Sequence, residues 1–536
     1  MEIVKQAWGA MWKWHNDVTD TLQFFTSGNP PASTISNKVE TSKTPKKNSS
    51  PGQKIGFILG PLMFIFILLF FSPPGLSQKG VAVLAGTVWV AVWWITEAIP
   101  IPATSLLPVI LFPLSGALES SEVTSAYGDN TIFLFMGGFI IAIAMEKWNL
   151  HKRIAMNIIL LIGTSTERIV LGFMLATGFL SMWISNTATA MMMLPIGAAV
   201  IYQVNESLER EGAVRTGHFS KVIMLGIAYS ASIGGLGTLI GTPPNTIFAA
   251  VVEQIYGVDF SFAKWMLFGV PIAIILLFTT WWYLIKVAFP LKIKELPGGR
   301  EIVEKENSSL GRITFEEKLV LTVFITTAFC WISRSFLLNQ WLPSLDDTII
   351  AITGALVLFI LPGRRETRLL KWEDAVKLPW GILLLFGGGL AIAKGFKDTG
   401  LAEWVGKQLT VLEGVPFIII LVAVTSFVIF LTEITSNTAT ATMMFPIMAA
   451  LSAALGVHPY SLMVAAGLAA SCAFMLPVAT PPNAVVFGSG YIKMGDMVKA
   501  GLWINLISIV FITLLIYFFM GLVWDIDVTS FPGNMR

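Results

Sequence analysis

Two short polar motifs stand in otherwise apolar parts of this sequence and carry the side chains best suited to binding chemistry. Segments Ser181–Ala190 and Thr432–Ala441 share the run Ser-Asn-Thr-Ala-Thr-Ala, and each has a second hydroxyl residue four positions before the serine of that run. Hydroxyl and amide groups donate hydrogen bonds to a carboxylate, and their oxygens ligate sodium, without a formal charge that is costly to bury. The motifs therefore favour a site that binds a small anion, cations or both.

The two motifs belong to a longer internal repeat. Their serines are 251 positions apart (436 − 185), and Leu134–Gly138 precedes the similar Leu385–Gly389 by the same distance (385 − 134). Gly241–Asn245 and Ala479–Asn483 share Thr-Pro-Pro-Asn at an offset of 238 (480 − 242), and a longer polar link at Asn205–His218 accounts for the difference. Self-similarity over this distance indicates a duplicated structural unit.

Each Ser-Asn-Thr motif lies in the middle of an apolar segment that is too long for one membrane crossing, namely Ile169–Ile201 and Phe417–Leu455. We interpret each segment as a re-entrant helical hairpin with the motif at its tip, where the carbonyl groups of one helix and the amide groups of the next meet. Carbonyl groups attract a cation, and amide groups attract an anion. The Pro-Pro-Asn segments are expected to break a second pair of helices, because proline lacks an amide donor.

Simpler structural explanations compete with these interpretations. A single Ser-Asn-Thr in an apolar helix is more often explained by hydrogen bonds between helices, but its duplication beside matching Pro-Pro-Asn segments favours a function. Glu433 is an intramembrane acid, and such residues often bind ions or take part in proton coupling. Met182 occupies the matching position in the other copy, so a structural role for Glu433, paired with a nearby hydroxyl or amide, is an equal alternative. Glu97 is interpreted as a structural residue at a helix end, and Gly387–Gly389 as a close-packing segment.

The overall composition indicates whether these motifs lie in a soluble protein or in a membrane protein. Hydrophobic residues make up 55% and charged residues 13% of 536 positions, which is too apolar for a soluble protein of this size. About ten or eleven stretches, from Gly56–Phe71 to Leu502–Leu522, reach the roughly 20 residues of a membrane-spanning helix. The net charge of +2 gives no indication of nucleic-acid binding, and Cys330 and Cys472 lie in separate apolar segments. The sequence therefore predicts an all-α polytopic membrane protein.

The distribution of charge predicts the orientation. Lys and Arg collect in the first 54 residues, in Lys152–Arg168, in Lys292–Arg312 and in Arg364–Lys371, and such clusters mark the cytoplasmic side. The N-terminus is then cytoplasmic and the C-terminus external, which requires an odd number of crossings. We expect about 11 transmembrane helices plus two re-entrant hairpins. With one leading helix, each repeat has five spans, and the two repeats must insert in opposite senses.

The predicted organisation follows from these features. Two amphipathic stretches, Glu146–Leu161 and Ala393–Leu409, are expected to be interfacial helices that precede the hairpins. The expected segments are a mobile cytoplasmic tail (1–54), a leading transmembrane helix (55–75), a first inverted repeat (79–290) with its hairpin at about 167–204, a cytoplasmic loop (291–315), a second inverted repeat (316–525) with its hairpin at about 415–457, and an external tail (526–536).

The paired Ser-Asn-Thr motifs, the Pro-Pro-Asn segments and the order of spans resemble the divalent anion/sodium symporter (DASS, INDY-like) family, in particular its bacterial sodium-dependent dicarboxylate transporters. The resemblance covers about residues 55 to 525. It implies a homodimer in the inner membrane, with lipid around it, in which each protomer has a scaffold domain and a transport domain that moves as an elevator. It also implies sodium as the coupling ion and C4 dicarboxylates such as succinate, malate and fumarate as substrates.

The resemblance further implies roles for individual residues. One sodium site would involve Ser181, Ser185, Asn186 and Gly234, and the other would involve Thr432, Thr435, Asn437 and Ala479. The substrate would contact Ser185, Asn186, Thr187, Ser436, Asn437, Thr438, Thr480 and Pro481. The two asparagines would then touch both sodium and substrate.

Other functions fit the sequence less well. A sodium-independent exchanger of dicarboxylates is the nearest alternative. An ion channel would need a continuous polar ring along a pore, which asymmetric repeats with broken helices do not suggest. An enzyme would need a reactive cluster, and no His, Cys or paired carboxylates gather near the motifs, so the sequence predicts a protein that is not an enzyme.

Overall fold

The computed structural model describes residues 51–163, 165–210, 217–291, 299–364, 368–412 and 414–535. Within these ranges the regular elements are all helices, with no strand, so the all-α prediction is confirmed. The first 50 residues of the expected tail, residues 292–298 of the expected loop and Arg536 lie outside the described residues. The first described helix begins at Pro51, so that the last four residues of the expected tail are helical.

The first part of the chain forms the helices that carry the first set of motifs. They are α2 (Pro51–Phe70), α3 (Gln78–Thr96), α4 (Ile101–Thr104), α5 (Leu107–Leu114), α6 (Ser120–Ser125), α7 (Asn130–Lys147), α8 (Leu150–Ile162), α9 (Thr166–Ser181), α10 (Asn186–Arg210), α11 (Gly217–Gly235), α12 (Pro243–Tyr256) and α13 (Phe262–Tyr283), with a 3-10 turn at Ala126–Gly128 and a π-helical turn at Leu284–Ala288.

The second part repeats much of this order. Its helices are α14 (Gly299–Ser309), α15 (Phe315–Ser333), α16 (Asp347–Ile360), α17 (Trp372–Ala375), α18 (Trp380–Asp398), α19 (Leu401–Leu409), α20 (Phe417–Thr432), α21 (Asn437–Leu455), α22 (Pro459–Ser471), α23 (Pro481–Phe487), α24 (Met494–Leu514) and α25 (Gly521–Trp524), with 3-10 turns at Leu338–Gln340, Thr410–Leu412 and Gly533–Met535 and a π-helical turn at Leu515–Met520. The order from α18 to α24 matches that from α7 to α13: a long helix, a short helix, a helix pair, a broken helix and a long helix.

The helices have the length and apolar character of membrane spans. Eight described helical segments pass this test, and a ninth is counted if the bent pair Leu401–Leu412 and Phe417–Thr432 is one span. Large apolar side chains such as Leu69 and Phe70 of α2 are exposed, as expected where a helix faces lipid. The chain is therefore a polytopic membrane protein, whereas eleven crossings and the opposite insertion of the repeats stay predictions.

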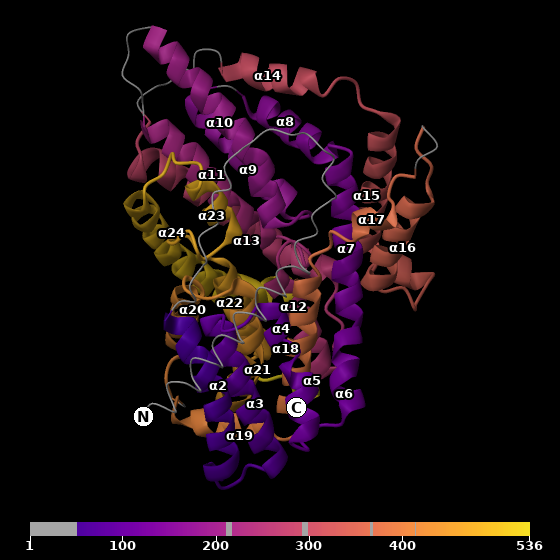
Figure 1. Cartoon of the computed structure of the whole chain (residues 1–536), viewed down its shortest axis with the longest axis vertical. Helices are drawn as coiled ribbons and strands as arrows, with labels where there is room; N and C mark the ends of the chain where they lie inside the picture. Colours follow the sequence, from indigo (N-terminus) through magenta and orange to yellow (C-terminus); the bar gives the residue numbers. More distant parts are fainter. Residues whose placement is uncertain are drawn as a thin grey trace, which may run out of the picture. The chain divides into compact units, whose positions relative to one another are not determined.

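Two groups of helices pack chiefly among themselves. In the first, which we call the site group (α9–α13 and α20–α24), α11 packs on α9, and α22 packs on α20 and α21. In the second, the frame group (α2–α7 and α15–α18), α3 packs on α2, and α16 packs on α7 and α15 (Figure 1). The short helices α8 and α19 follow α7 and α18, and they pack on α9 and α21 of the site group.

Three consecutive glycines let α18 approach its neighbours closely. A Cβ atom added at Gly388 would lie 2.5 Å from the carbonyl oxygen of Ser105, and side chains added at Gly387 and Gly389 would meet Tyr127 and Thr442. The interpretation of this segment as a close-packing surface is thereby confirmed. Because Thr442 belongs to α21, the segment joins the frame group to the second Ser-Asn-Thr helix.

We expect Gly388→Ala to lower the stability of the protein by roughly 1–3 kcal/mol, because the new methyl group must displace backbone. The loss would appear as a lower melting temperature of the purified protein in detergent. Gly495→Ala is the matched control: Gly495 is also helical, but it has no atom within 4 Å of its Cβ position. That control should be neutral or slightly stabilising, since alanine favours helix over glycine. Equal melting temperatures for the two variants would contradict the close-packing role.

Candidate functional site

Both Ser-Asn-Thr motifs lie at breaks between helices, with the asparagine as the first residue of the second helix. Helix α9 ends at Ser181 and α10 begins at Asn186, while α20 ends at Thr432 and α21 begins at Asn437. The tips Met182–Ser185 and Glu433–Ser436 hold the backbone groups that the helix ends leave unpaired. Each tip therefore combines carbonyl groups at a negative helix end with amide groups at a positive one.

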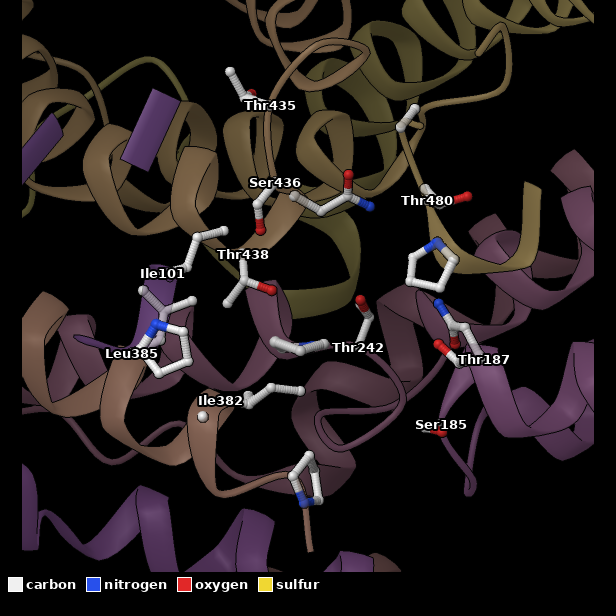
Figure 2. A pocket seen from close by; sticks show the side chains of 18 of the residues that line it. Ile101, Ser185, Thr187, Thr242, Ile382, Leu385, Thr435, Ser436, Thr438 and Thr480 are labelled. Atoms are coloured by element: carbon white, nitrogen blue, oxygen red, sulfur yellow. The ribbon is translucent and has the colours of Figure 1, made fainter. Parts of the chain in front are cut away.

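One cavity of about 660 Å³ lies against both tips. This volume is in the range of pockets that bind small molecules. It is lined by all eight residues predicted to contact the substrate: Ser185, Asn186, Thr187, Ser436, Asn437, Thr438, Thr480 and Pro481. Figure 2 shows their hydroxyl groups approaching from different elements, with Thr187 and Ser185 on one tip and Ser436 and Thr438 on the other.

The cavity has both polar and apolar lining residues. The hydroxyl and amide groups of the motifs come from the site group. The frame group contributes Gln53 and Thr96 and a larger number of apolar residues, such as Ile382 and Leu385 in Figure 2. Among the described lining residues, Glu97 is the one with an ionisable side chain, and it lies just after the end of α3. An anion in this cavity would therefore contact neutral donors and helix N-termini, because no Lys or Arg is among the described lining residues.

The first motif forms a compact cluster of oxygens. One amide position of Asn186 lies 2.5 Å from Ser181 Oγ, 3.1 Å from the Ala231 carbonyl oxygen and 3.2 Å from the Gly241 carbonyl oxygen. If the amide nitrogen occupies this position, its two N–H groups can donate to two of these three oxygens. If the amide oxygen occupies it, the Ser181 hydroxyl can donate to it at 2.5 Å, and the carbonyl oxygens of Ala231 and Gly241 lie beside it. The residues present thus fit a sodium ion.

The second motif repeats this arrangement. Thr432 Oγ1 lies 2.8 Å from Asn437 Oδ1 and 2.9 Å from the Ala470 carbonyl oxygen, to which it can donate. Thr435 and Thr440 add a pair of hydroxyl groups 2.6 Å apart. A hydroxyl group, an amide and a carbonyl from the neighbouring broken helix therefore meet in both copies.

The residues predicted to bind sodium fall into two sets. Ser185, Asn186, Thr435, Asn437 and Ala479 line the cavity, whereas Ser181, Thr432 and Gly234 are buried and are not among its lining residues. Gly234 packs against Gly178 of α9. The neighbouring Gly235 lies next to the Asn186 amide, since a Cβ atom added at Gly235 would lie 2.8 Å from Asn186 Oδ1.

The Pro-Pro-Asn segments begin the second halves of two broken helices, as predicted. The break between α11 and α12 is held by Asn245, whose Nδ2 donates to the carbonyl oxygens of Gly235 at 3.0 Å and Thr238 at 2.8 Å. In the second copy, Asn483 Nδ2 donates to the carbonyl oxygens of Ala473 at 3.0 Å and Leu476 at 3.1 Å. Each asparagine therefore donates to carbonyl groups that have lost their helical hydrogen-bond partners at the break.

Glu433 stabilises the break between α22 and α23. Its buried carboxylate accepts hydrogen bonds from the backbone N–H groups of Phe474, Met475 and Leu476, at 2.8 to 3.0 Å, and from Asn505 Nδ2 at 2.7 Å. Four donors around one carboxylate offset the cost of burying its charge. Of the two roles open from the sequence, these contacts support the structural one.

Several residues that line the cavity had no predicted binding role, and Thr242 and Glu97 are two of them. Thr242 lines it from the start of α12, with no side-chain capping bond, and the offset of 238 already pairs Thr242 with Thr480. Glu97 lies at the end of α3, as expected, with a left-handed backbone (φ 48°), and its exposed side chain also lines the cavity. No sequence signal places Glu97 there, because its position depends on how α3 packs.

Comparisons with known proteins identify related sequences. A profile described as "Sodium:sulfate symporter transmembrane region" matches residues 54–525. A protein of Staphylococcus saprophyticus named sodium-dependent dicarboxylate transporter SdcS is 52% identical over 496 residues, which cover 91% of this chain and 96% of that protein. The protein of the same name from Staphylococcus aureus strain USA300 is 52% identical over 492 residues, covering 90% and 94%.

Two solved structures share the fold at low sequence identity. The YdaH transporter of Alcanivorax borkumensis matches with a TM-score of 0.53 and 13% identity, over 74% of this chain and 87% of that chain. MtrF of Neisseria gonorrhoeae matches with a TM-score of 0.52 and 12% identity, over 86% and 94%. Both are distant in sequence, so they bear on the fold alone.

The two roles considered for Glu433 predict different responses to sodium. Glu433→Gln places an NH₂ group against N–H donors, so we expect stability to fall by roughly 1–3 kcal/mol. The melting temperature in detergent should fall equally in sodium chloride and in choline chloride, with the exposed Glu373→Gln as the control. A fall confined to sodium chloride would contradict the structural role and support ion binding.

Proposed function

Since the chain belongs to the sodium:sulfate symporter family, we propose that it is a secondary transporter that carries C4 dicarboxylates, such as succinate, malate and fumarate, into the cell together with sodium. One observation carries this proposal: two clusters of uncharged oxygens, each beside a helix N-terminus, face a single cavity whose described lining contains no cationic side chain. The names of the SdcS proteins support the choice of sodium and of dicarboxylates.

The coupling of ion and substrate has a direct physical explanation. A dicarboxylate brings two negative charges to a site built of neutral groups. A sodium ion about 4 Å from a carboxylate contributes ~4 kcal/mol at an effective dielectric constant of about 20, whereas a neutral hydrogen bond contributes about 1 kcal/mol. Bound sodium therefore raises substrate affinity by orders of magnitude, and by linkage the substrate raises sodium affinity equally.

In this proposal, Asn186 and Asn437 connect the two kinds of ligand. Each asparagine begins a helix and lines the cavity, and its amide also belongs to the oxygen cluster behind the tip. The side-chain oxygen would ligate sodium while the helix N-terminus faces a substrate carboxylate. Ser181 and Thr432 would complete the ion sites from behind, and Thr187, Thr438 and Thr480 would donate to the substrate.

The arrangement of the two groups of helices supports movement of one past the other. The motif hydroxyl and amide groups that line the cavity belong to the site group and many of its apolar lining residues to the frame group, so a bound substrate would move with the site group. We assign the site group to the transport domain and the frame group to the scaffold of an elevator mechanism. The family resemblance supports a homodimer through the scaffold.

The proposed orientation places the open side of the cavity toward the cytoplasm. Gln53, near the start of α2, and the exposed Ile95 and Glu97, at the end of α3, line the cavity. The start of α2 follows the Lys-rich first 50 residues, which the positive-inside rule assigns to the cytoplasmic side of the inner membrane.

The central test is transport by purified protein in proteoliposomes. An inward sodium gradient should drive uptake of labelled succinate, and Asn186→Ala or Asn437→Ala should lower the rate at least about 100-fold, because each removes a group shared by ion and substrate. Asn157→Ala, on the exposed face of α8, is the control and should transport normally. Uptake that is unchanged when sodium is replaced by choline would reject symport and favour the sodium-independent exchanger.

A second prediction concerns Thr242, the counterpart of Thr480. If its hydroxyl group donates to a substrate carboxylate, Thr242→Val should raise the KM for succinate roughly 10- to 100-fold, as expected for a hydrogen bond to a charged group. The shape of the side chain is nearly preserved, so the melting temperature should change little. Thr322→Val, exposed on α15, provides the control. An unchanged KM would exclude Thr242 from the substrate site.

A further inference from the structure

The two hairpin tips occupy matching positions in the repeat but have different surroundings. Trp183 and Ile434 are counterparts, because 434 − 183 gives the repeat offset of 251. Trp183 is buried, with 9% of its surface exposed, whereas Ile434 is 67% exposed and lines the cavity. The first tip is therefore packed and the second tip is open.

Aromatic contacts hold the packed tip against the frame group. The Trp183 ring lies edge-on to Phe324 of α15, with centroids 5.1 Å apart, and nearly parallel to Phe262 at 6.0 Å. Phe262, the first residue of α13, stacks in turn on Trp331 of α15 at 4.6 Å. The row therefore runs Phe324, Trp183, Phe262, Trp331, with two rings of the site group between two rings of the frame group.

A buried ion pair fixes the far end of this row of rings. Asp347 Oδ2 accepts the backbone N–H of Phe262 at 2.7 Å, and Asp347 Oδ1 lies 2.8 Å from Arg334 Nε. Arg334 also reaches Asp259, in the link between α12 and α13, with Nη2 to Oδ2 at 2.8 Å. Arg334 and Asp347 are 3% and 6% exposed, so water screens their attraction little.

These charges bridge the two groups of helices. Arg334 follows the end of α15 and Asp347 begins α16, both in the frame group, whereas Asp259 and Phe262 belong to the site group. The buried Trp183 Nε1 has no hydrogen-bond partner among the described residues. This unpaired N–H costs free energy in the packed state and would be satisfied by water once the tip is released.

We propose that Trp183, Phe262, Arg334 and Asp347 form a latch that holds the first hairpin tip against α15 while the second tip is open, and that transport requires this latch to release. Release would free the site group to move, so that the first tip opens and Ile434 of the second tip becomes packed. The inference rests on the proposed transport function, but its test does not require transport.

The test uses a cysteine at position 434 as a reporter of the open tip. Ile434→Cys is introduced into a chain in which Cys330 and Cys472 are replaced by alanine, and the purified protein in detergent is treated with a water-soluble thiol reagent. Adding Asp347→Asn, which removes the charge that pairs with Arg334, should slow labelling at least about threefold, because the population shifts toward the state in which position 434 is packed. General destabilisation would act in the opposite direction and speed labelling.

Two further variants complete the design. Asp496→Asn weakens the Lys221–Asp496 ion pair, also 2.8 Å long, but both of its residues lie in the site group, so labelling should not change. Trp183→Leu removes the ring contacts with Phe324 and Phe262 and leaves no buried charge unpaired. It should slow labelling even if Asp347→Asn does not fold. The latch would be overturned if labelling is unchanged or faster in Trp183→Leu, and also in Asp347→Asn where that variant folds. Absent sodium-driven uptake together with slowed labelling would instead reject only the proposed transport function.

Discussion

The binding site depends on broken helices inside a membrane, where no water is present to satisfy free backbone groups. A broken helix supplies amide and carbonyl groups for ligands, but every other group at the break needs a partner within the protein. Asn245 and Asn483 meet this need by donating to carbonyl groups across their breaks. Because these side chains occupy some of the free oxygens, fewer groups stay unpaired, and the remaining ones are those that would bind ions and substrate in the proposed function.

The two repeats satisfy this constraint with different side chains. Met182 and Glu433 occupy the same position, just after the first helix of each hairpin. In the first copy, the Met182 carbonyl oxygen accepts from Thr238 Oγ1, and the N–H of Gly237 donates to Gly234 within the turn. In the second copy, the Glu433 carboxylate accepts three backbone N–H groups directly. Both solutions tie the hairpin tip to the broken helix beside it, so an acid at this position need not be an ion ligand.

Much of the site could be predicted from local sequence, because local chemistry determines where the helices break. A Pro-Pro-Asn segment or a cluster of small polar residues favours a helix break through its local chemistry, although single prolines such as Pro195 and Pro446 lie inside helices. Helices α10, α12, α21 and α23 begin at or next to the expected residues. The duplication then indicated which breaks belong together. The close approach of Gly235 to Asn186 could not be predicted, because it depends on how α11 packs against the first hairpin. Likewise, Glu97 reaches the cavity through the packing of α3, which leaves no local signature.

The difference between Trp183 and Ile434 shows why a sequence repeat does not predict a symmetrical structure. If both tips were packed, the cavity would be closed; if both were open, substrate could leak across the membrane. A transporter built from two related halves must therefore place equivalent residues in different surroundings at any one time. If each tip takes both surroundings during transport, as proposed, neither can be strongly preferred. The unpaired indole N–H of Trp183 lowers the preference of the first tip for its buried state. Imperfect packing at such a contact is then a requirement of alternating access rather than a defect of the fold.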